Sequence, residues 1–194
     1  MKIIAGTYKG RNFFMPEGIR PTQSLTRKAL FDLLGQHLAG LTFLDLFAGS
    51  GAVGLEALSR GAEKVTFVEK DERSSELIRE NLGLLGVPLI GRDKHALYEV
   101  VEADAFASIK RFSAGGKKFD IVFVDPPYSL GLAKKVLKTL GSYDIVTANC
   151  IVVIQHEKEE ILPEAQGNLV RSEQRKYGST VLSIYKFPGI RMPG

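Results

Sequence analysis

Residues 43–54 read FLDLFAGSGAVG, a short apolar run that leads into a glycine-rich loop. Gly49, Gly51 and Gly54 follow the G-x-G-x-x-G spacing of dinucleotide-binding folds. Glycines at these places allow a tight turn and let the backbone approach a ligand closely. The apolar run predicts a strand and the residues after the loop a helix, which together open a parallel α/β sheet.

The rest of the chain continues this alternation of strands and helices. The pattern predicts strands over residues 42–47, 64–69, 98–103, 119–125 and 150–155, helices over 53–60, 71–85, 106–112 and 131–140, and a closing antiparallel hairpin over 169–175 and 180–187. Such alternation predicts a mixed, mostly parallel sheet with helices on both faces. We therefore expect a Rossmann-like α/β domain over residues 41–194, preceded by a small extension over 1–40.

The extension is predicted to hold a short β-hairpin and one helix. Residues 2–5 and 11–15 are β-like and are punctuated by glycines, which favours pairing between them. A helix is predicted to open at residues 20–22, which read RPT, and to end at Gly40.

Basic residues concentrate in the same extension. Of a formal net charge of +4, residues 1–28 carry six basic side chains and one acidic one, whereas the remaining chain carries 20 basic and 21 acidic residues. A basic arm on a nearly neutral body predicts a polyanionic partner, although ordinary solvated charge explains the count equally well. The residues predicted to contact phosphates are Lys9, Arg11, Arg20, Arg27 and Lys28.

Two carboxylates near the glycine loop indicate which cofactor it binds. Glu69 follows Gly49 by 20 residues at the end of the next predicted strand, where a carboxylate can accept hydrogen bonds from ribose hydroxyls. Asp45 precedes the loop, where it would oppose the pyrophosphate of NAD but attract the ammonium group of S-adenosylmethionine. The alternative is that Asp45 only caps the turn.

Asp104 is a third acidic residue that we expect at this edge of the sheet. It follows the third predicted strand, where its carboxylate can accept from the adenine amino group while Phe106 packs near the ring. An N-cap for the following helix explains Asp104 equally well.

Residues 125–128 read DPPY at the end of the fourth predicted strand, the kind of place where open α/β sheets bind ligands. The exocyclic amine of a base is a poor nucleophile because its lone pair is delocalised into the ring. The Asp125 carboxylate and the Pro126 carbonyl can accept its two hydrogens, and Pro126 and Pro127 restrict the backbone that holds them. Tyr128 offers a flat face for stacking an extruded base. A strand terminator with a buried tyrosine is the structural alternative.

With these motifs in place, the chain resembles the bacterial 16S rRNA guanine-N2 methyltransferase D family over nearly its whole length. The similar segments are residues 2–11 (KIIAGTYKGR), 20–31, 44–62, 120–128 and 175–178 (RKYG). Leu25 and Lys28 depart from the arginine and glutamate that are usual in that family.

The resemblance implies a class I S-adenosylmethionine methyltransferase that modifies a guanine N2 in 16S rRNA. Its partner is expected to be the small ribosomal subunit or an assembly intermediate of it. The implied catalytic residues are Asp125, Pro126, Pro127 and Tyr128. The residues expected to bind S-adenosylmethionine are Asp45, Phe47, Ala48, Gly49, Ser50, Gly51, Glu69, Lys70, Asp104 and Ala105.

Several other functions share part of this pattern. An amino-methyltransferase acting on DNA adenine N6 or on a protein glutamine amide would share Asp45 and a similar tetrapeptide. The complete tetrapeptide argues against a non-catalytic RNA-binding protein on the same fold, and Asp45 argues against an NAD oxidoreductase.

The composition indicates which covalent and metal sites to expect and where the protein acts. Cys150 is the single cysteine, so no internal disulfide forms, and the three histidines lack metal-ligand spacing, so we expect no metal. No stretch resembles a signal peptide or a membrane span. We expect a monomer in the cytoplasm.

Overall fold

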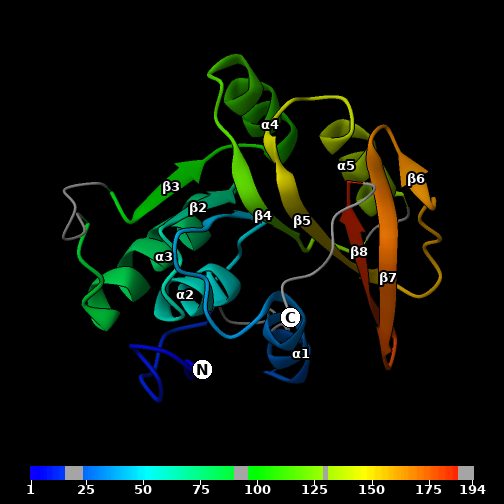
Figure 1. Ribbon diagram of the computed structural model, residues 1–194. Helices are drawn as coiled ribbons and strands as arrows, with labels where there is room; N and C mark the ends of the chain where they lie inside the picture. The colour runs from blue at the N-terminus through cyan, green and yellow to red at the C-terminus, as the bar shows by residue number, and fades with distance from the viewer. Residues whose placement is uncertain (16–23, 90–95, 129–130, 188–194) are drawn as a thin grey trace. The chain divides into compact units, whose positions relative to one another are not determined.

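The computed structural model describes residues 1–15, 24–89, 96–128 and 131–187 of the 194-residue chain (Figure 1). The chain divides into two compact units, Met1–Ala105 and Phe106–Gly194. The first unit contains the glycine-rich loop, and the second contains the tetrapeptide of residues 125–128.

The first unit contains three parallel strands and three helices. Its elements are α1 (Ser24–Leu34), β1 (Thr42–Leu46), α2 (Ala52–Ser59), β2 (Lys64–Glu69), α3 (Glu72–Leu85) and β3 (Tyr98–Glu102). The strands lie in the order β3-β2-β1, with Asp45 in register with Phe67 and Phe67 with Val100. Helix α2 packs against β1 and β2, and α3 packs against β2 and β3. Because the strands are parallel, their carboxyl ends share one edge, where the glycine-rich loop leaves β1.

The second unit combines one parallel pair of strands with an antiparallel group. Its elements are α4 (Ala105–Ala114), which begins at the boundary, β4 (Phe119–Val124), α5 (Leu132–Leu140), β5 (Val146–Glu157), β6 (Ala165–Gln166), β7 (Leu169–Tyr177) and β8 (Thr180–Lys186). The strand order is β4-β5-β8-β7-β6, with β4 parallel to β5 and the other pairs antiparallel. The long hairpin of β7 and β8 turns at Gly178, whose φ is 62°. Figure 1 shows this hairpin in orange and red.

The predicted Rossmann-like fold class is confirmed. Strands β1 to β4, β7 and β8 each begin at the predicted residue. The prediction for β5 was wrong at its start, because the strand begins at Val146 and not at 150. Alternating polar residues such as Thr147 and Asn149 hid those four residues, and a register irregularity between Phe119 and Ile121 accommodates them. The two-residue strand β6 was not predicted.

The N-terminal extension differs more from its prediction. Helix α1 ends at Leu34 instead of Gly40, because Gly35 adopts a left-handed φ of 92°. The predicted hairpin pairing forms, but only over a short stretch. An antiparallel bridge joins Lys2 to Asn12, and the N–H groups of Ile3 and Phe13 donate to the carbonyls of Arg11 and Met1 on either side of it. The predicted helix opening at residues 20–22 lies outside the described residues. Within the described parts of the chain, every helix is too short or too polar to cross a membrane.

Candidate functional site

The glycine-rich loop follows β1 in a strained conformation. Phe47 has a φ of 62°, and it is the only non-glycine residue with a positive φ in the described part of the chain. Gly49 and Gly51 also have positive φ values, 54° and 76°. A left-handed conformation costs a residue with a side chain about 1–2 kcal/mol, so neighbouring contacts must hold the loop in this shape.

Glu69 supplies one of these contacts from the end of β2. Its Oε2 accepts a hydrogen bond from the Gly49 N–H at 2.8 Å. Its Oε1 accepts from the N–H groups of Lys70 and Asp71 at 2.8 and 2.9 Å. The sequence placed Glu69 beside the loop correctly, and the structure shows that its carboxylate also orders the loop backbone.

Asp45 supplies a second contact from within β1. It is only 2% exposed, and its Oδ2 accepts from the N–H of Gly54 in the first turn of α2 at 2.9 Å. A carboxylate at a helix N-terminus is favoured by the unpaired N–H groups and the helix dipole. Asp45 therefore anchors the helix that follows the loop through the Gly54 N–H. Its role in cofactor binding stays a prediction.

The third glycine of the motif serves helix packing. A Cβ at Gly54 would lie 2.2 Å from Cε1 of Phe67 on β2. A Cβ at Gly51 would lie 3.1 Å from Cγ1 of Ile78 on α3. The glycines therefore let α2 lie close to the sheet and to α3, the role expected of the last glycine in such loops.

The ends of β2 and β3 converge beside the loop. The Ala103 N–H donates to the Glu69 carbonyl at 2.9 Å. Asp104 follows directly and is exposed, whereas Ala105 is buried at the start of α4, and Lys70 is exposed. The residues predicted to bind the cofactor thus lie at one edge of the first unit, and Ala105 is the last residue of that unit. The others are Asp45, Phe47, Ala48, Gly49, Ser50, Gly51, Glu69, Lys70 and Asp104.

The tetrapeptide stands in the second unit at the end of β4. Val124 pairs in register with Ile154 of β5, and Asp125 is the next residue and is half-buried. Pro126 is buried and Pro127 is exposed. Tyr128 is 52% exposed, and its hydroxyl lies 3.4 Å from Oγ1 of Thr180 at the start of β8. The structural alternative of a buried tyrosine is therefore wrong, and the ring presents an open face.

Comparison with known proteins assigns the family. The model described as "Conserved hypothetical protein 95" matches residues 1–186. The chain belongs to this family. Ribosomal RNA small subunit methyltransferase D of Escherichia coli is 31% identical over 188 residues, which is 96% of this chain and 89% of that protein. The YlbH protein of Bacillus subtilis is 35% identical and covers 97% of this chain and all of its own length. The solved structure of yhhF from E. coli superposes with a TM-score of 0.82 at 31% identity, over 96% of this chain and 97% of that one.

These relatives confirm the predicted resemblance to the methyltransferase D family, and they place this member of the Conserved hypothetical protein 95 family among proteins named for rRNA methylation. The match includes the N-terminal extension, since it begins at the first residue. Leu25 and Lys28, the two departures from the family pattern, are both exposed on α1, so neither substitution disturbs the core.

Arg27 is a correction to the predicted phosphate contacts. It is only 1% exposed, so it cannot meet RNA, and its guanidinium donates to the Lys2 carbonyl at 2.7 Å. Its Nε lies 3.9 Å from the carboxylate of Glu56, which is completely buried in α2. The charge count over residues 1–28 placed Arg27 among the exposed basic residues, and only the tertiary structure reveals its buried partner.

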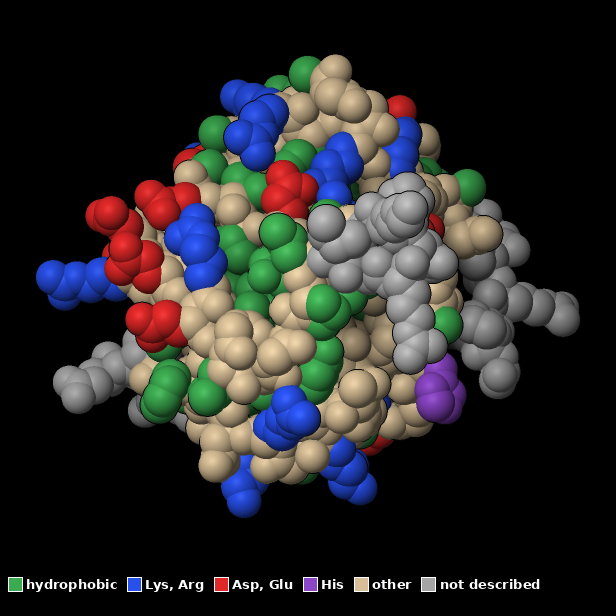
Figure 2. All heavy atoms as spheres, turned by 90° about the vertical axis from the view of Figure 1, so that its left-hand side faces the viewer, with side chains coloured by type: hydrophobic (Ala, Val, Ile, Leu, Met, Phe, Trp, Pro, Cys, Tyr) green, Lys and Arg blue, Asp and Glu red, His purple; other side chains and the backbone are tan. Residues whose placement is uncertain are grey.

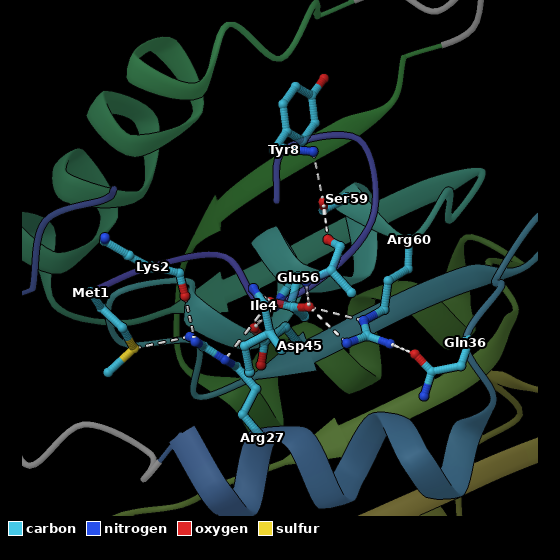
Figure 3. Close-up of polar contacts among 12 residues, drawn as sticks. Met1, Lys2, Ile4, Tyr8, Arg27, Gln36, Asp45, Glu56, Ser59 and Arg60 are labelled. Carbon is cyan, nitrogen blue, oxygen red and sulfur yellow. Dashed lines mark hydrogen bonds and ion pairs between the residues drawn. The ribbon is translucent and has the colours of Figure 1, made fainter. Parts of the chain in front are cut away.

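Glu56 organises a polar cluster that the sequence did not predict. Its two oxygens accept from the N–H groups of Ile4 and Ala5 at 2.8 and 3.0 Å, and Arg60 donates to it through Nε at 2.9 Å. Figure 3 shows Arg27 and Arg60 approaching Glu56 from opposite sides. The cluster fixes the start of the chain onto α2, the helix that leaves the glycine-rich loop.

The described residues include no group of three or more His, Cys, Asp or Glu side chains arranged to hold a metal ion. His156 is buried between the Glu157 carbonyl and the Ser183 hydroxyl, each 2.8 Å away, and burial lowers the pKa of its imidazole. It therefore serves the packing of β5 against β8.

Proposed function

We propose that this protein transfers a methyl group from S-adenosylmethionine to the exocyclic N2 of a guanine in the 16S rRNA of the small ribosomal subunit. The observation that carries the proposal is the half-buried Asp125 followed by Pro126, Pro127 and an exposed Tyr128 at the end of a buried strand. Family membership with methyltransferase D supports the substrate class.

The cofactor is assigned to the edge of the first unit that carries the glycine-rich loop. A carboxylate offers about four acceptor positions, and Glu69 uses three of them on backbone N–H groups, which leaves capacity for a ribose hydroxyl. Asp45 carries the negative charge that suits the cofactor ammonium, and Asp104 is exposed where it can accept from the adenine amine. The backbone of the glycine-rich loop lies along the cofactor in this proposal, and Lys70 and Ala105 flank it. The loop residues concerned are Phe47, Ala48, Gly49, Ser50 and Gly51. When bound, the sulfonium of S-adenosylmethionine supplies an electrophilic methyl group.

The target amine is assigned to residues 125–128. The Asp125 carboxylate and the Pro126 carbonyl would accept hydrogen bonds from the two amine hydrogens and so localise the nitrogen lone pair. As the nitrogen bonds to the methyl carbon, the carbon–sulfur bond would break to leave S-adenosylhomocysteine, and the amine would lose one proton to the Asp125 carboxylate or to water. The step depends mainly on holding nitrogen, carbon and sulfur in line. Tyr128 stacks on the extruded guanine through its exposed face.

We propose that the N-terminal extension, residues 1–40, docks the RNA backbone. Lys9 and Arg11 are exposed, and the Arg11 guanidinium is held by the Leu85 carbonyl at 2.6 Å and lies 5.6 Å from the centre of the Tyr8 ring. Lys28 is exposed on α1, whereas Arg20 lies outside the described residues. Figure 2 shows Lys and Arg side chains on one face of the molecule, interspersed with apolar side chains and with Asp and Glu. RNA phosphates would contact the basic side chains.

Salt dependence tests this docking role. The Lys9→Ala/Arg11→Ala double variant should flatten the log–log dependence of RNA affinity on salt by about one unit per lost phosphate contact. Lys138→Ala, an exposed lysine on α5, is the control and should leave the slope as it is. An unchanged slope in a folded double variant would remove these two residues from RNA binding.

Methyl transfer to competing acceptors tests the proposed function itself. With labelled S-adenosylmethionine, small ribosomal subunits from a strain lacking this protein should accept label, whereas adenine-containing DNA and a glutamine peptide should not. Asp125→Ala should abolish transfer while calorimetry shows unchanged affinity for S-adenosylhomocysteine. Label in DNA or peptide alone would favour an alternative acceptor, and binding of NADH without S-adenosylmethionine would refute the cofactor assignment.

A further inference from the structure

Asn81 of α3 touches both the N-terminal segment and the glycine-rich loop. Its Oδ1 accepts from the Phe14 N–H at 2.7 Å, and its Nδ2 donates to the Phe14 carbonyl at 3.0 Å. The same Nδ2 donates to the Ser50 carbonyl at 3.2 Å. The residue is completely buried, and both of its amide hydrogens are used. The partners fix which end of the amide is which, because the Phe14 N–H requires an acceptor and the two carbonyls require a donor.

The Ser50 carbonyl lies in the part of the loop where several residues have positive φ values. Ser50 stands between Gly49 and Gly51, which both have positive φ, and follows the strained Phe47 by three residues. Glu69 fixes the Gly49 N–H and Asp45 fixes α2 after the loop. Asn81 adds a third contact to the loop, and this one comes from α3. The same side chain also binds the backbone of Phe14.

Phe14 connects this contact to the surface. Its backbone is held by Asn81, but its side chain is 58% exposed. Arg11, three residues earlier, is also exposed and is anchored at Leu85, in the same helix as Asn81. The segment of residues 11–14 is thus fixed on α3 with the side chains of Arg11, Asn12 and Phe14 exposed, whereas Phe13 is buried.

We propose that Asn81 is a positioning residue that couples RNA docking on the N-terminal segment to cofactor binding at the glycine-rich loop. The inference rests on the proposed function, because it needs RNA at residues 9–14 and S-adenosylmethionine at the loop. RNA bound to Arg11 and Phe14 further stabilises the contact of Phe14 with Asn81, and Asn81 in turn stabilises Ser50 in the shape that the cofactor contacts. Coupling of this kind is reciprocal, so cofactor also tightens RNA binding by the same factor.

Ser59 provides the matched control. Its hydroxyl accepts from the Tyr8 N–H at 3.0 Å, and its carbonyl accepts from the Thr7 N–H at 2.7 Å. It is buried like Asn81 and also holds the N-terminal segment, but it lies at the far end of α2, and its hydroxyl bonds only to Tyr8 and Ala5 of that segment within the described residues. Ser59→Ala therefore loosens the segment and leaves the link between residue 14 and the loop in place.

The experiment compares S-adenosylhomocysteine affinity with and without saturating small-subunit RNA. In the parent protein and in Ser59→Ala, we expect RNA to raise the affinity about three- to tenfold, within the usual range of coupling between sites. In Asn81→Ala the ratio should fall to about one, and the affinity without RNA should fall about tenfold. Loss of stability alone would raise this ratio, because RNA that binds the folded state increases the folded fraction, so it does not explain a ratio of about one.

A second variant keeps the test valid if Asn81→Ala folds poorly. Asn81→Leu has nearly the same size and places no charge in this buried site, and because its side chain cannot donate to the Ser50 carbonyl, the ratio should again be about one. A ratio in either folded variant equal to that of the parent would overturn the proposal, as would a parent ratio of one. Failure of the parent to bind S-adenosylhomocysteine at all would instead refute the proposed function.

Discussion

Replacing Glu56 by glutamine removes the one negative charge at the centre of a buried cluster of three ionised side chains. Glu56 is 0% exposed, Arg27 is 1% exposed and Arg60 is 5% exposed. Burial lowers the pKa of Arg27, Arg60 lowers it further, and Glu56 is the neighbour that raises it. With glutamine at position 56, the two buried cations therefore lose the carboxylate that they share.

The expected loss of stability follows from breaking a buried ion pair. Removing one partner of such a pair costs about 3–5 kcal/mol, because the remaining charge is left desolvated. The glutamine amide also turns an NH2 group toward either the Ile4 or the Ala5 N–H, each of which now donates to Glu56. An unsatisfied buried donor adds about 1–3 kcal/mol unless water reaches it. For a chain of 194 residues, we expect the melting temperature to fall by roughly 10 °C or more.

Equilibrium unfolding in urea measures this loss. The control is Glu102→Gln, which removes the carboxylate of a half-exposed pair with Arg79 at 3.8 Å and should cost less than about 1 kcal/mol. If Glu56→Gln lowers the free energy of unfolding by no more than Glu102→Gln does, the cluster does not stabilise the attachment of the N-terminal segment and the reasoning is wrong.

Three further changes test other parts of the account. Gly54→Ala should destabilise the protein by about 1–3 kcal/mol in urea unfolding, since the new Cβ meets the Phe67 ring at 2.2 Å, and an unchanged midpoint would show that the ring yields freely. Burial lowers the pKa of His156 from its ordinary value of 6.5, so its contribution to stability is complete above that pH and is lost as the pH falls through the lowered value. Parent protein should accordingly lose more stability than His156→Gln between about pH 7 and pH 5, and equal losses would contradict this assignment. Tyr128→Ala should slow single-turnover methyl transfer far more than Tyr128→Phe, because stacking needs the ring and not the hydroxyl; equal rates would exclude stacking.

The strands and the loop could be predicted because their signals are local. An apolar run followed by three spaced glycines specifies a strand, a tight turn and a helix in twelve residues, and β1 and α2 lie where that pattern puts them. Asp125 could be placed at a strand end because the preceding residues are continuously apolar and the following prolines stop the ladder.

The polar cluster and the loop contact could not be predicted because they depend on distant residues. Glu56 is 52 residues from Ile4, and Asn81 is 67 residues from Phe14. On a helical pattern each is one polar residue among several, with no spacing that marks it as buried. Arg27 is an example. A count of charges predicted that it contacts an RNA phosphate, whereas in the fold it pairs with the buried Glu56.

The identity of the methylated nucleoside tests the central claim most directly. Small ribosomal subunits from a strain lacking this protein are incubated with it and labelled S-adenosylmethionine, and the extracted 16S rRNA is digested to nucleosides and separated by mass spectrometry. We predict label in N2-methylguanosine, at one site per subunit, with parent protein and none with Asp125→Ala. Label in N6-methyladenosine or in another nucleoside, or full labelling by Asp125→Ala, would contradict the account.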